Sequence, residues 1–162
     1  MNAEIIVIRL LHIVPGVVWA GSAVLMALVI GPRLRRAGTL SDLGVYGEVA
    51  GSVARVMNIT GALTIVFGLV LIFRMDRFSD LFATGWGWSI TGGIVLAILA
   101  MGASGALSGS LRRLTNAASG SSEMGMISGD NDSVAGRVGM IAYVNAVLVV
   151  VAVGAMAAAR FV

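Results

Sequence analysis

The chain has 162 residues, of which 58% are hydrophobic and 12% charged, and its formal net charge is +3 at pH 7. Soluble domains carry about 25% charged residues to cover a water-facing surface, so a chain this apolar is predicted to lie in a lipid bilayer. Cysteine is absent from the sequence, which excludes disulfides and thiolate metal sites.

Four apolar runs are each long enough to cross the hydrocarbon layer, which takes about 20 residues of helix. Backbone groups must be paired inside a membrane, and strand-like alternation is absent, so each run is predicted to be helical. The expected fold class is all-α, an integral membrane four-helix bundle that forms a single domain over residues 1–162. The predicted helices cover residues 5–31, 42–74, 86–113 and 135–160.

The first run is too long for the apolar part of a signal peptide, and Glu4 interrupts the basic leader that such a peptide needs. It is therefore predicted to be a membrane helix. It contains the only histidine of the chain, in the stretch "LLHIVPGVVWAG" at residues 10–21. Pro15 removes the hydrogen bond to the Leu11 carbonyl and is expected to kink the helix beside His12.

Residues spaced three or four apart in this run lie along one face of the predicted helix and form a stripe. The residues of this stripe are Arg9, His12, Gly16, Trp19, Ala23 and Met26. His12 offers an imidazole ligand, and Gly16 leaves space for a flat group close to the backbone. Trp19 would line the edge of that group, and Arg9 could meet a propionate. This arrangement predicts a b-type haem site, with His12 as the metal ligand and Arg9, Gly16 and Trp19 as cofactor-binding residues.

Other roles for His12 stay open. A lone histidine in a membrane can hold a bundle together by hydrogen bonding to a neighbouring helix, or it can take part in proton or quinone chemistry. The polar side chains available as partners are Asn58, Thr60, Tyr143 and Asn145. The second axial position of a haem has several candidates as well, namely Met26, Met57, Met101, Met140, His12 of a second copy, or an open site.

The connections between the runs differ in character. Residues 74–88, "RMDRFSDLFATGWGW", are expected to form a short interfacial turn of helix, with Trp86 and Trp88 at headgroup level. The segment from Thr115 to Ser133 is rich in Ser, Gly, Asn and Asp and is predicted to be a mobile loop.

Arginine is the only basic residue type and lies mainly at the ends of the apolar runs, where positive charge orients a membrane protein. Nucleic acid is therefore not an expected partner. The loops after the first and third runs are predicted to face the cytoplasm, because they hold Arg33, Arg35, Arg36, Arg112, Arg113 and Arg137. Both termini are then expected on the outer side of the plasma membrane.

Small residues at helical spacing predict close helix contacts. Gly105 and Gly109 form a GxxxG pair, and Gly102 begins a parallel row with Ala106 and Ser110. Further pairs are Gly47 with Gly51 and Gly154 with Ala158. Such faces could pack inside the bundle or against another membrane subunit.

Short motifs also carry a family resemblance. His12, Trp19 and Gly21, followed by "GPRLRR" from Gly31, resemble the small four-helix membrane proteins related to copper-resistance protein D. The first helix is similar, more loosely, to the haem-binding four-helix proteins assigned as protoporphyrinogen oxidases. The segment "ARVMNITGALTIVFGLVL" at residues 54–71 resembles the arginine followed by an apolar Thr-Gly segment in the second helix of this family. The segment "MAAAR" at residues 156–160 is also similar to family sequences. The resemblance implies a four-helix membrane protein that handles haem or copper.

The function predicted from the sequence is haem binding through His12, with a role in membrane electron transfer as an oxidoreductase or as its cofactor-bearing subunit. One alternative is a non-catalytic accessory subunit of a larger respiratory or photosynthetic complex, and another is a copper-handling membrane protein. Paired catalytic carboxylates, nucleophile motifs, phosphate-binding loops and zinc-ligand spacings are absent from the sequence, which argues against a hydrolase or an ATPase. Lipid, other membrane subunits or a second copy are the expected partners.

Overall fold

The computed structural model describes residues 3–36, 40–120 and 129–161, and these residues form helices and short turns without any strand. The predicted all-α fold class is confirmed. The first span consists of α1 (Ala3–Leu25), a π-helical turn (Met26–Ile30) and α2 (Gly31–Arg36). The remaining elements are α3 (Leu40–Arg74), the 3₁₀ turn η2 (Ser79–Phe82), α4 (Gly85–Gly120), α5 (Gly129–Ala158) and a final 3₁₀ turn (Ala159–Phe161).

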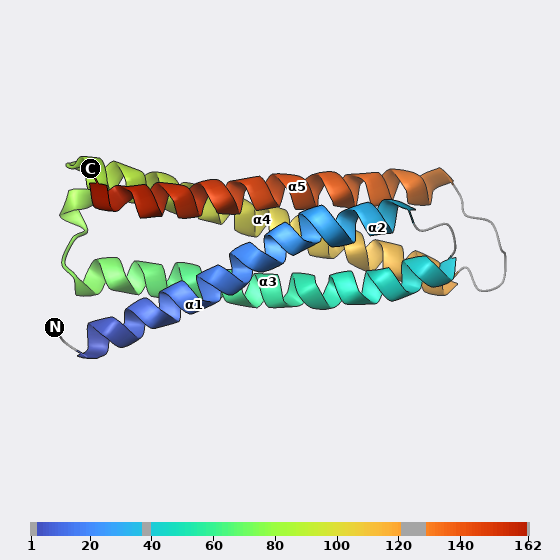
Figure 1. Cartoon of the computed structure of the whole chain (residues 1–162), viewed down its shortest axis with the longest axis horizontal. Coiled ribbons are helices and arrows are strands. Elements are labelled where there is room, and N and C mark those ends of the chain that lie inside the picture. The colour runs from blue at the N-terminus through green and yellow to red at the C-terminus, as the bar shows by residue number, and fades with distance from the viewer. Residues whose placement is uncertain (1–2, 37–39, 121–128, 162) are drawn as a thin grey trace.

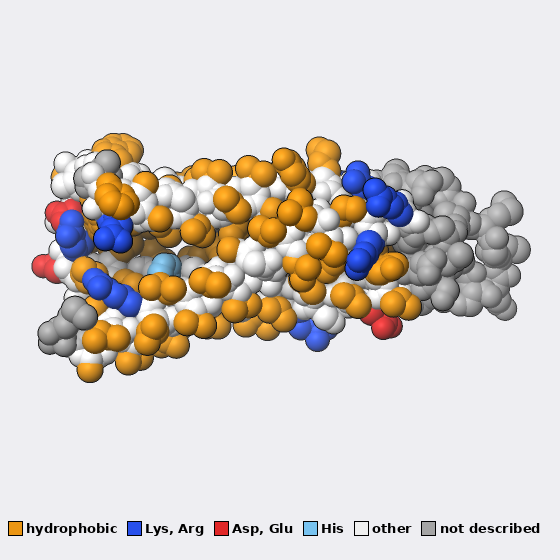
Figure 2. All heavy atoms as spheres, viewed as in Figure 1, with side chains coloured by type: hydrophobic (Ala, Val, Ile, Leu, Met, Phe, Trp, Pro, Cys, Tyr) orange, Lys and Arg blue, Asp and Glu red, His pale blue; other side chains and the backbone are white. Residues whose placement is uncertain are grey.

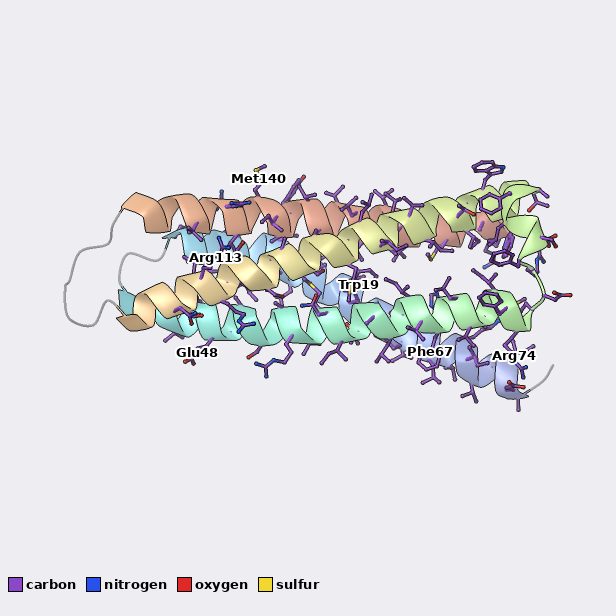
Figure 3. The ribbon with its side chains drawn as sticks, turned by 180° about the vertical axis from the view of Figure 1, so that it is seen from behind. Trp19, Glu48, Phe67, Arg74, Arg113 and Met140 are labelled. Atoms are coloured by element: carbon purple, nitrogen blue, oxygen red, sulfur yellow. The ribbon has the colours of Figure 1, made fainter. Side chains whose placement is uncertain are left out.

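The four long helices are arranged as two diagonal helices on opposite faces of a pair. Figures 1 and 3 show α3 and α5 along the long axis, with α1–α2 crossing them on one face and α4 on the other. Both termini lie at the same end of the bundle (Figure 1). Within the described residues, no Cα atom of α1 comes within 8 Å of α4, and none of α3 comes within 8 Å of α5. The backbone of each long helix therefore approaches two neighbouring helices closely, and across the α3–α5 diagonal the described helices meet through side chains.

The four helices are long and apolar enough to cross a membrane, over Ala3–Arg36, Gly44–Arg74, Gly85–Asn116 and Val134–Phe161. Their outer faces carry exposed aliphatic side chains, among them Val17, which is 67% exposed, and Leu28, which is 65% exposed. Figure 2 shows hydrophobic side chains over the middle of the visible face and arginines near its two ends. The chain is a multi-pass membrane protein in contact with lipid.

The interior is built mainly from small side chains, which let the helices approach closely without a hydrophobic driving force. Alanines provide much of the core, and the larger buried groups fill the space between them. The residues buried in the centre include Ala54, Met57, Ala100, Leu107, Leu111, Ala142, Val149 and Ala23.

A polar network crosses the middle of the bundle. The Ser104 hydroxyl donates to Asn145 Oδ1 at 3.2 Å, and both residues are fully buried. Asn145 Nδ2 in turn donates to Met57 Sδ at 3.7 Å, and Asn58 Nδ2 donates to Ser108 Oγ at 2.8 Å. These contacts join α3, α4 and α5, and they supply partners for amides that would otherwise be costly in hydrocarbon.

The first span is longer than the sequence predicted. The helix was expected to end at residue 31, but "GPRLRR" continues it as α2. Pro32 has no N–H to donate, and the preceding π turn widens the helix there, with the Gly31 N–H bonded to the Met26 carbonyl. Pro15, by contrast, lies inside α1 without ending it.

The part of the predicted 115–133 loop that the structure describes is helical throughout. α4 continues to Gly120 and α5 begins at Gly129, so the loop prediction is wrong for residues 115–120 and 129–133. The other residues of that segment lie outside the described ranges. Helix propagation costs little once a long helix exists, so α4 and α5 extend past their apolar parts despite a loop-like composition. A short turn of helix, η2, is present in the 74–88 connection as expected, and its interfacial position stays a prediction.

The predicted packing role of the α4 and α5 glycines is wrong inside this bundle. A Cβ added at Gly102, Gly105, Gly109 or Gly154 would meet nothing within 4 Å, and all four positions are exposed. The reason is that α4 turns a different face, containing Ser104, Leu107 and Leu111, toward the core. Spacing alone does not specify which face of a helix packs.

The close approaches occur at other glycines. A Cβ at Gly61 would lie 2.9 Å from Trp19 Cε2, and one at Gly47 would lie 2.9 Å from Thr115 Cγ2. A Cβ at Gly31 would lie 3.6 Å from the Cα of Gly139, which brings the backbones of α2 and α5 together. Gly47 was predicted as a packing residue, whereas Gly61 was not.

These contacts predict different responses to the same substitution. Gly61→Ala places a methyl group against the Trp19 ring and is expected to destabilise the fold by about 1–3 kcal/mol. Gly105→Ala adds a methyl group in open space and should change stability by less than about 0.5 kcal/mol. Thermal unfolding of the two variants in one detergent provides the measurement. Equal midpoints would contradict the packing described here.

The orientation of the bundle is a separate prediction. Because the chain has no cysteine, single cysteines can be placed at Ser79, in η2, and at Asn116, near the end of α4. Both positions are exposed and lie at opposite ends. An impermeant thiol reagent applied to whole cells should label Ser79→Cys only. Labelling of Asn116→Cys alone would reverse the predicted topology.

Candidate functional site

A cavity of about 160 Å³ lies at the end of the bundle that carries the termini. It forms because the N-terminal half of α1 leans on α3 and has no backbone approach to α4. Figure 2 shows the single histidine visible at the bottom of a hollow beside this half of α1. The lining is formed by His12, Gly68, Leu71, Ile72, Met75, Arg77, Trp86, Ile90, Ile94 and Met156. We call this space the outer cleft, after the side of the membrane on which the termini are predicted to lie.

A hydrogen bond to α3 fixes the tautomer of the His12 imidazole. Its Nδ1 lies 2.7 Å from the carbonyl oxygen of Thr64, and a carbonyl can only accept, so Nδ1 carries the hydrogen. In the neutral ring the lone pair is then on Nε2, which has no hydrogen-bond partner among the described residues. The Nδ1–H bond to a backbone carbonyl is the arrangement that orients metal-binding histidines.

Gly68 makes this ring position possible. A Cβ at residue 68 would lie 2.9 Å from His12 Cε1 and 3.0 Å from Nδ1, closer than side chains tolerate. A smaller cavity of about 30 Å³ adjoins the ring and is also lined by Thr64, Ala97 and Met156. The imidazole is thus clamped between helices on one side and faces free space on the other.

Two of the predicted haem-site residues lie elsewhere. The space beside Gly16 is filled by Thr64, whose Cγ2 would be 3.3 Å from an added Cβ. Trp19 is only 3% exposed and packs on Gly61, about midway along the bundle (Figure 3). Its indole N–H has no acceptor within the described part of the chain. The residues of the predicted stripe do share one face of α1. Because α3 covers this face at Gly16 and Trp19, neither residue lines the outer cleft.

Arg9 and Arg77 bring positive charge to the rim of the outer cleft. Arg9 is exposed, and its Nη2 lies 3.9 Å from the Sδ of Met75, which lines the cleft. Arg77 stacks over Trp86, with its Cζ 4.2 Å from the ring centroid, and its Nε lies 2.9 Å from Asp80 Oδ2. An ion pair between Arg74 and Glu4 links the nearby ends of α3 and α1.

Trp86 is positioned by the start of α4. The Thr84 hydroxyl accepts the backbone N–H of Gly87 at 3.0 Å, which is the usual cap of a helix N-terminus. A Cβ at Gly87 would lie 2.0 Å from the Asp80 carbonyl oxygen, so only glycine lets α4 begin against η2. Trp86 was predicted as a headgroup anchor, and it also forms a wall of the cleft. Trp88 is 63% exposed.

The methionines that line the outer cleft were not among the predicted second ligands. Met26 and Met57 are fully buried in the core, Met101 approaches Gly61, and Met140 is 71% exposed on α5 and points away from the bundle (Figure 3). The methionines that do line the cleft are Met75 and Met156. Their expected depth in the membrane could have identified them, because both residues are near helix ends that are predicted on the same side of the membrane as the start of α1.

The predicted hydrogen-bond partners of His12 have other contacts. Asn58 and Asn145 belong to the central polar network, and the Thr60 hydroxyl donates to the Val56 carbonyl of its own helix at 2.8 Å. Tyr143 is 60% exposed. A backbone carbonyl was missed as a partner because sequence reasoning considered only polar side chains.

The fold and the cleft define a four-helix multi-pass membrane protein with one imidazole facing a mainly apolar cavity near one end. Comparisons with protein-family profiles, with curated proteins and with solved structures find no match. The chemistry of the site therefore has to be argued from its own residues.

The tautomer of His12 is a direct test of this geometry, since the chain contains one histidine only. In protein labelled with ¹⁵N-histidine and kept in alkaline buffer without added metal, we expect the neutral Nδ1–H tautomer. Gly68→Ala pushes on the ring and should shift the population toward a mixture, whereas Gly105→Ala should not. A dominant Nε2–H signal in the parent protein would contradict the bond to Thr64.

Proposed function

We propose that this chain binds a b-type haem through Nε2 of His12 and serves electron transfer in the plasma membrane, as an oxidoreductase or as a subunit of one. The observation that carries the proposal is the Nδ1 contact to the Thr64 carbonyl at 2.7 Å. It leaves the other ring nitrogen free to act as a ligand toward the outer cleft, in a mainly apolar setting.

The surroundings support a cofactor of this kind. Leu71, Ile72, Ile90 and Ile94 give the cleft walls that exclude water. Arg9 and Arg77 lie at the rim, where guanidinium groups suit the carboxylates of a porphyrin. When bound, the haem iron would supply one-electron chemistry, and a His or His/Met ligand set is common for such iron.

Size limits how a macrocycle fits. The cleft volume of about 160 Å³ is close to the roughly 150 Å³ of a cavity that holds benzene. Only one edge of a porphyrin fits this volume, and the rest would lie in the hollow that opens beside α1 (Figure 2). Gly16 and Trp19 contribute nothing to this seat, so the proposal rests on His12 and the cleft lining.

A cuprous ion is the second candidate, because of the two methionines. Met75 from the end of α3 and Met156 from α5 line the same cavity as His12. Thioether and imidazole groups are the soft ligands that favour Cu(I), and a single ion needs far less space than a porphyrin. A metal site built from carboxylates is not proposed as an alternative, since no group of three His, Cys, Asp or Glu is found among the described residues.

Spectra and metal content separate these proposals. Protein produced with adequate haem supply should show reduced haem bands, and His12→Ala should remove them while the helical content stays unchanged. Met140→Leu is the matched control, because this methionine is exposed and distant from the cleft. Met75→Leu and Met156→Leu should shift the bands if a thioether is the second ligand.

The copper alternative gives a different pattern. A colourless protein that binds one Cu(I), and loses it in His12→Ala, Met75→Leu and Met156→Leu but not in Met140→Leu, would replace haem by copper. A protein that binds neither would refute both proposals. His12 would then be an interhelical hydrogen-bonding residue, as expected for a non-catalytic accessory subunit.

A further inference from the structure

A second hollow lies between α3 and α4 near the opposite end of the bundle from the outer cleft. Its volume is about 660 Å³, and unlike the outer cleft it has polar or charged side chains at seven of its twelve lining residues. The side chains that matter for its chemistry are Glu48, Ser52, Arg55 and Asn58 on α3 and Ser108 and Arg112 on α4. We call it the α3–α4 groove.

Small residues open this groove. Gly47 contacts Thr115 closely, which fixes the distance between the two helices at one end. At Gly51, one turn further along, an added Cβ would meet nothing within 4 Å, so the groove widens there. The hydrogen bond of 2.8 Å between Asn58 and Ser108 bridges the helices at the deep end. The result is a shaped recess rather than a flat helix face.

The two arginines of the groove have no carboxylate partner among the described residues. Arg74 and Arg77 at the other end form ion pairs with Glu4 and Asp80. Within the described residues, Arg55 and Arg112 form none, and both are exposed.

Glu48 lines the same groove but lies seven residues from Arg55, which is about 10 Å along the helix axis. Figure 3 shows Glu48 toward the loop end of α3, so the carboxylate lies about two helical turns farther toward that end than Arg55.

Arg55 and Arg112 border uncharged segments, which places them at the depth of the lipid headgroups in a membrane. Arg55 directly precedes the run Val56–Phe73, which contains no charged residue, and Arg112 directly follows the uncharged run 81–111. Both guanidinium groups therefore belong to the boundary between hydrocarbon and water. Ile59, which is 56% exposed, continues the groove from Arg55 toward the middle of the membrane.

We propose that the α3–α4 groove binds an anionic phospholipid, with Arg55 and Arg112 on its phosphate and an acyl chain along Ile59. Guanidinium groups bind phosphate oxygens through paired charge-assisted hydrogen bonds, and basic pockets between membrane helices select acidic headgroups. Ser52 offers a further hydroxyl donor for headgroup oxygens, whereas the Ser108 hydroxyl donates to the Ser104 carbonyl at 3.0 Å. A phospholipid is favoured over free phosphate because the recess continues from the charged boundary onto an apolar surface.

Native mass spectrometry of the full chain in detergent tests the proposal with three probes, namely phosphatidylglycerol, phosphatidylcholine and inorganic phosphate. We expect the parent protein to retain phosphatidylglycerol in preference to phosphatidylcholine. Arg55→Gln with Arg112→Gln should weaken phosphatidylglycerol retention about tenfold or more. Arg113→Gln is the matched control, because this exposed arginine neighbours Arg112 in the sequence but does not line the groove.

Other outcomes would overturn the proposal. Equal retention of the two lipids, or unchanged retention in the double variant, would exclude an acidic-lipid site at these arginines. Competition by inorganic phosphate as strong as that by the lipid would assign the groove to a free anion. If the double variant fails to fold, Arg55→Lys and Arg112→Lys keep the charge and should lose only part of the binding. Metal or haem content at His12 should not change in any of these variants.

Discussion

The structure depends on the way α1 and α3 interlock through glycine. His12 lies on Gly68, Trp19 lies on Gly61, and Thr64 fills the space at Gly16, so a large group faces a glycine at each level. Because these contacts hold the N-terminal half of α1 against α3, this half diverges from α4 and α5, and the divergence leaves the outer cleft. The same contact that stabilises the bundle therefore creates the cavity and places the imidazole in it. Packing and site geometry cannot be varied independently here, since a larger residue at position 68 would move the ring that defines the site.

Polar groups within the spans are mostly used up by the fold. The central network pairs Ser104, Asn145, Asn58 and Ser108, and threonines bond to carbonyls of their own helices. Apart from the Trp19 indole N–H, which has no acceptor among the described residues, two sets of polar groups remain available beside a recess. They are Nε2 of His12 at one end of the bundle and the guanidinium groups of Arg55 and Arg112 near the other. Unused polar groups near hydrocarbon are costly unless a ligand or water meets them. This distribution is the common physical basis for proposing a metal centre in the outer cleft and an acidic lipid in the α3–α4 groove.

The exposed glycines of α4 show how far a spacing motif can be interpreted. Gly102, Gly105 and Gly109 have the spacing of a helix-packing face, yet within this chain they face outward. The core face of α4 instead contains Ser104, Leu107 and Leu111, which have side chains that can bond to or fill the interior. The accessory-subunit alternative remains a proposal. It would use the exposed glycine face of α4, which no described residue of this chain covers.

The sequence by itself determined the fold class, the number of spans and the presence of a short helical turn between the second and third spans, since these depend on local hydrophobicity and on the need to pair every backbone group in a membrane. It also identified His12 and its stripe, because helical periodicity is a local property. Only the tertiary structure decided what covers that stripe. Whether Gly16 faces a cofactor or Thr64, whether Met75 and Met156 or other methionines join His12, and which glycines meet a neighbour all depend on the rotation and crossing of whole helices. In lipid this rotation is set by many small contacts spread over several helices, so no single segment of sequence contains it.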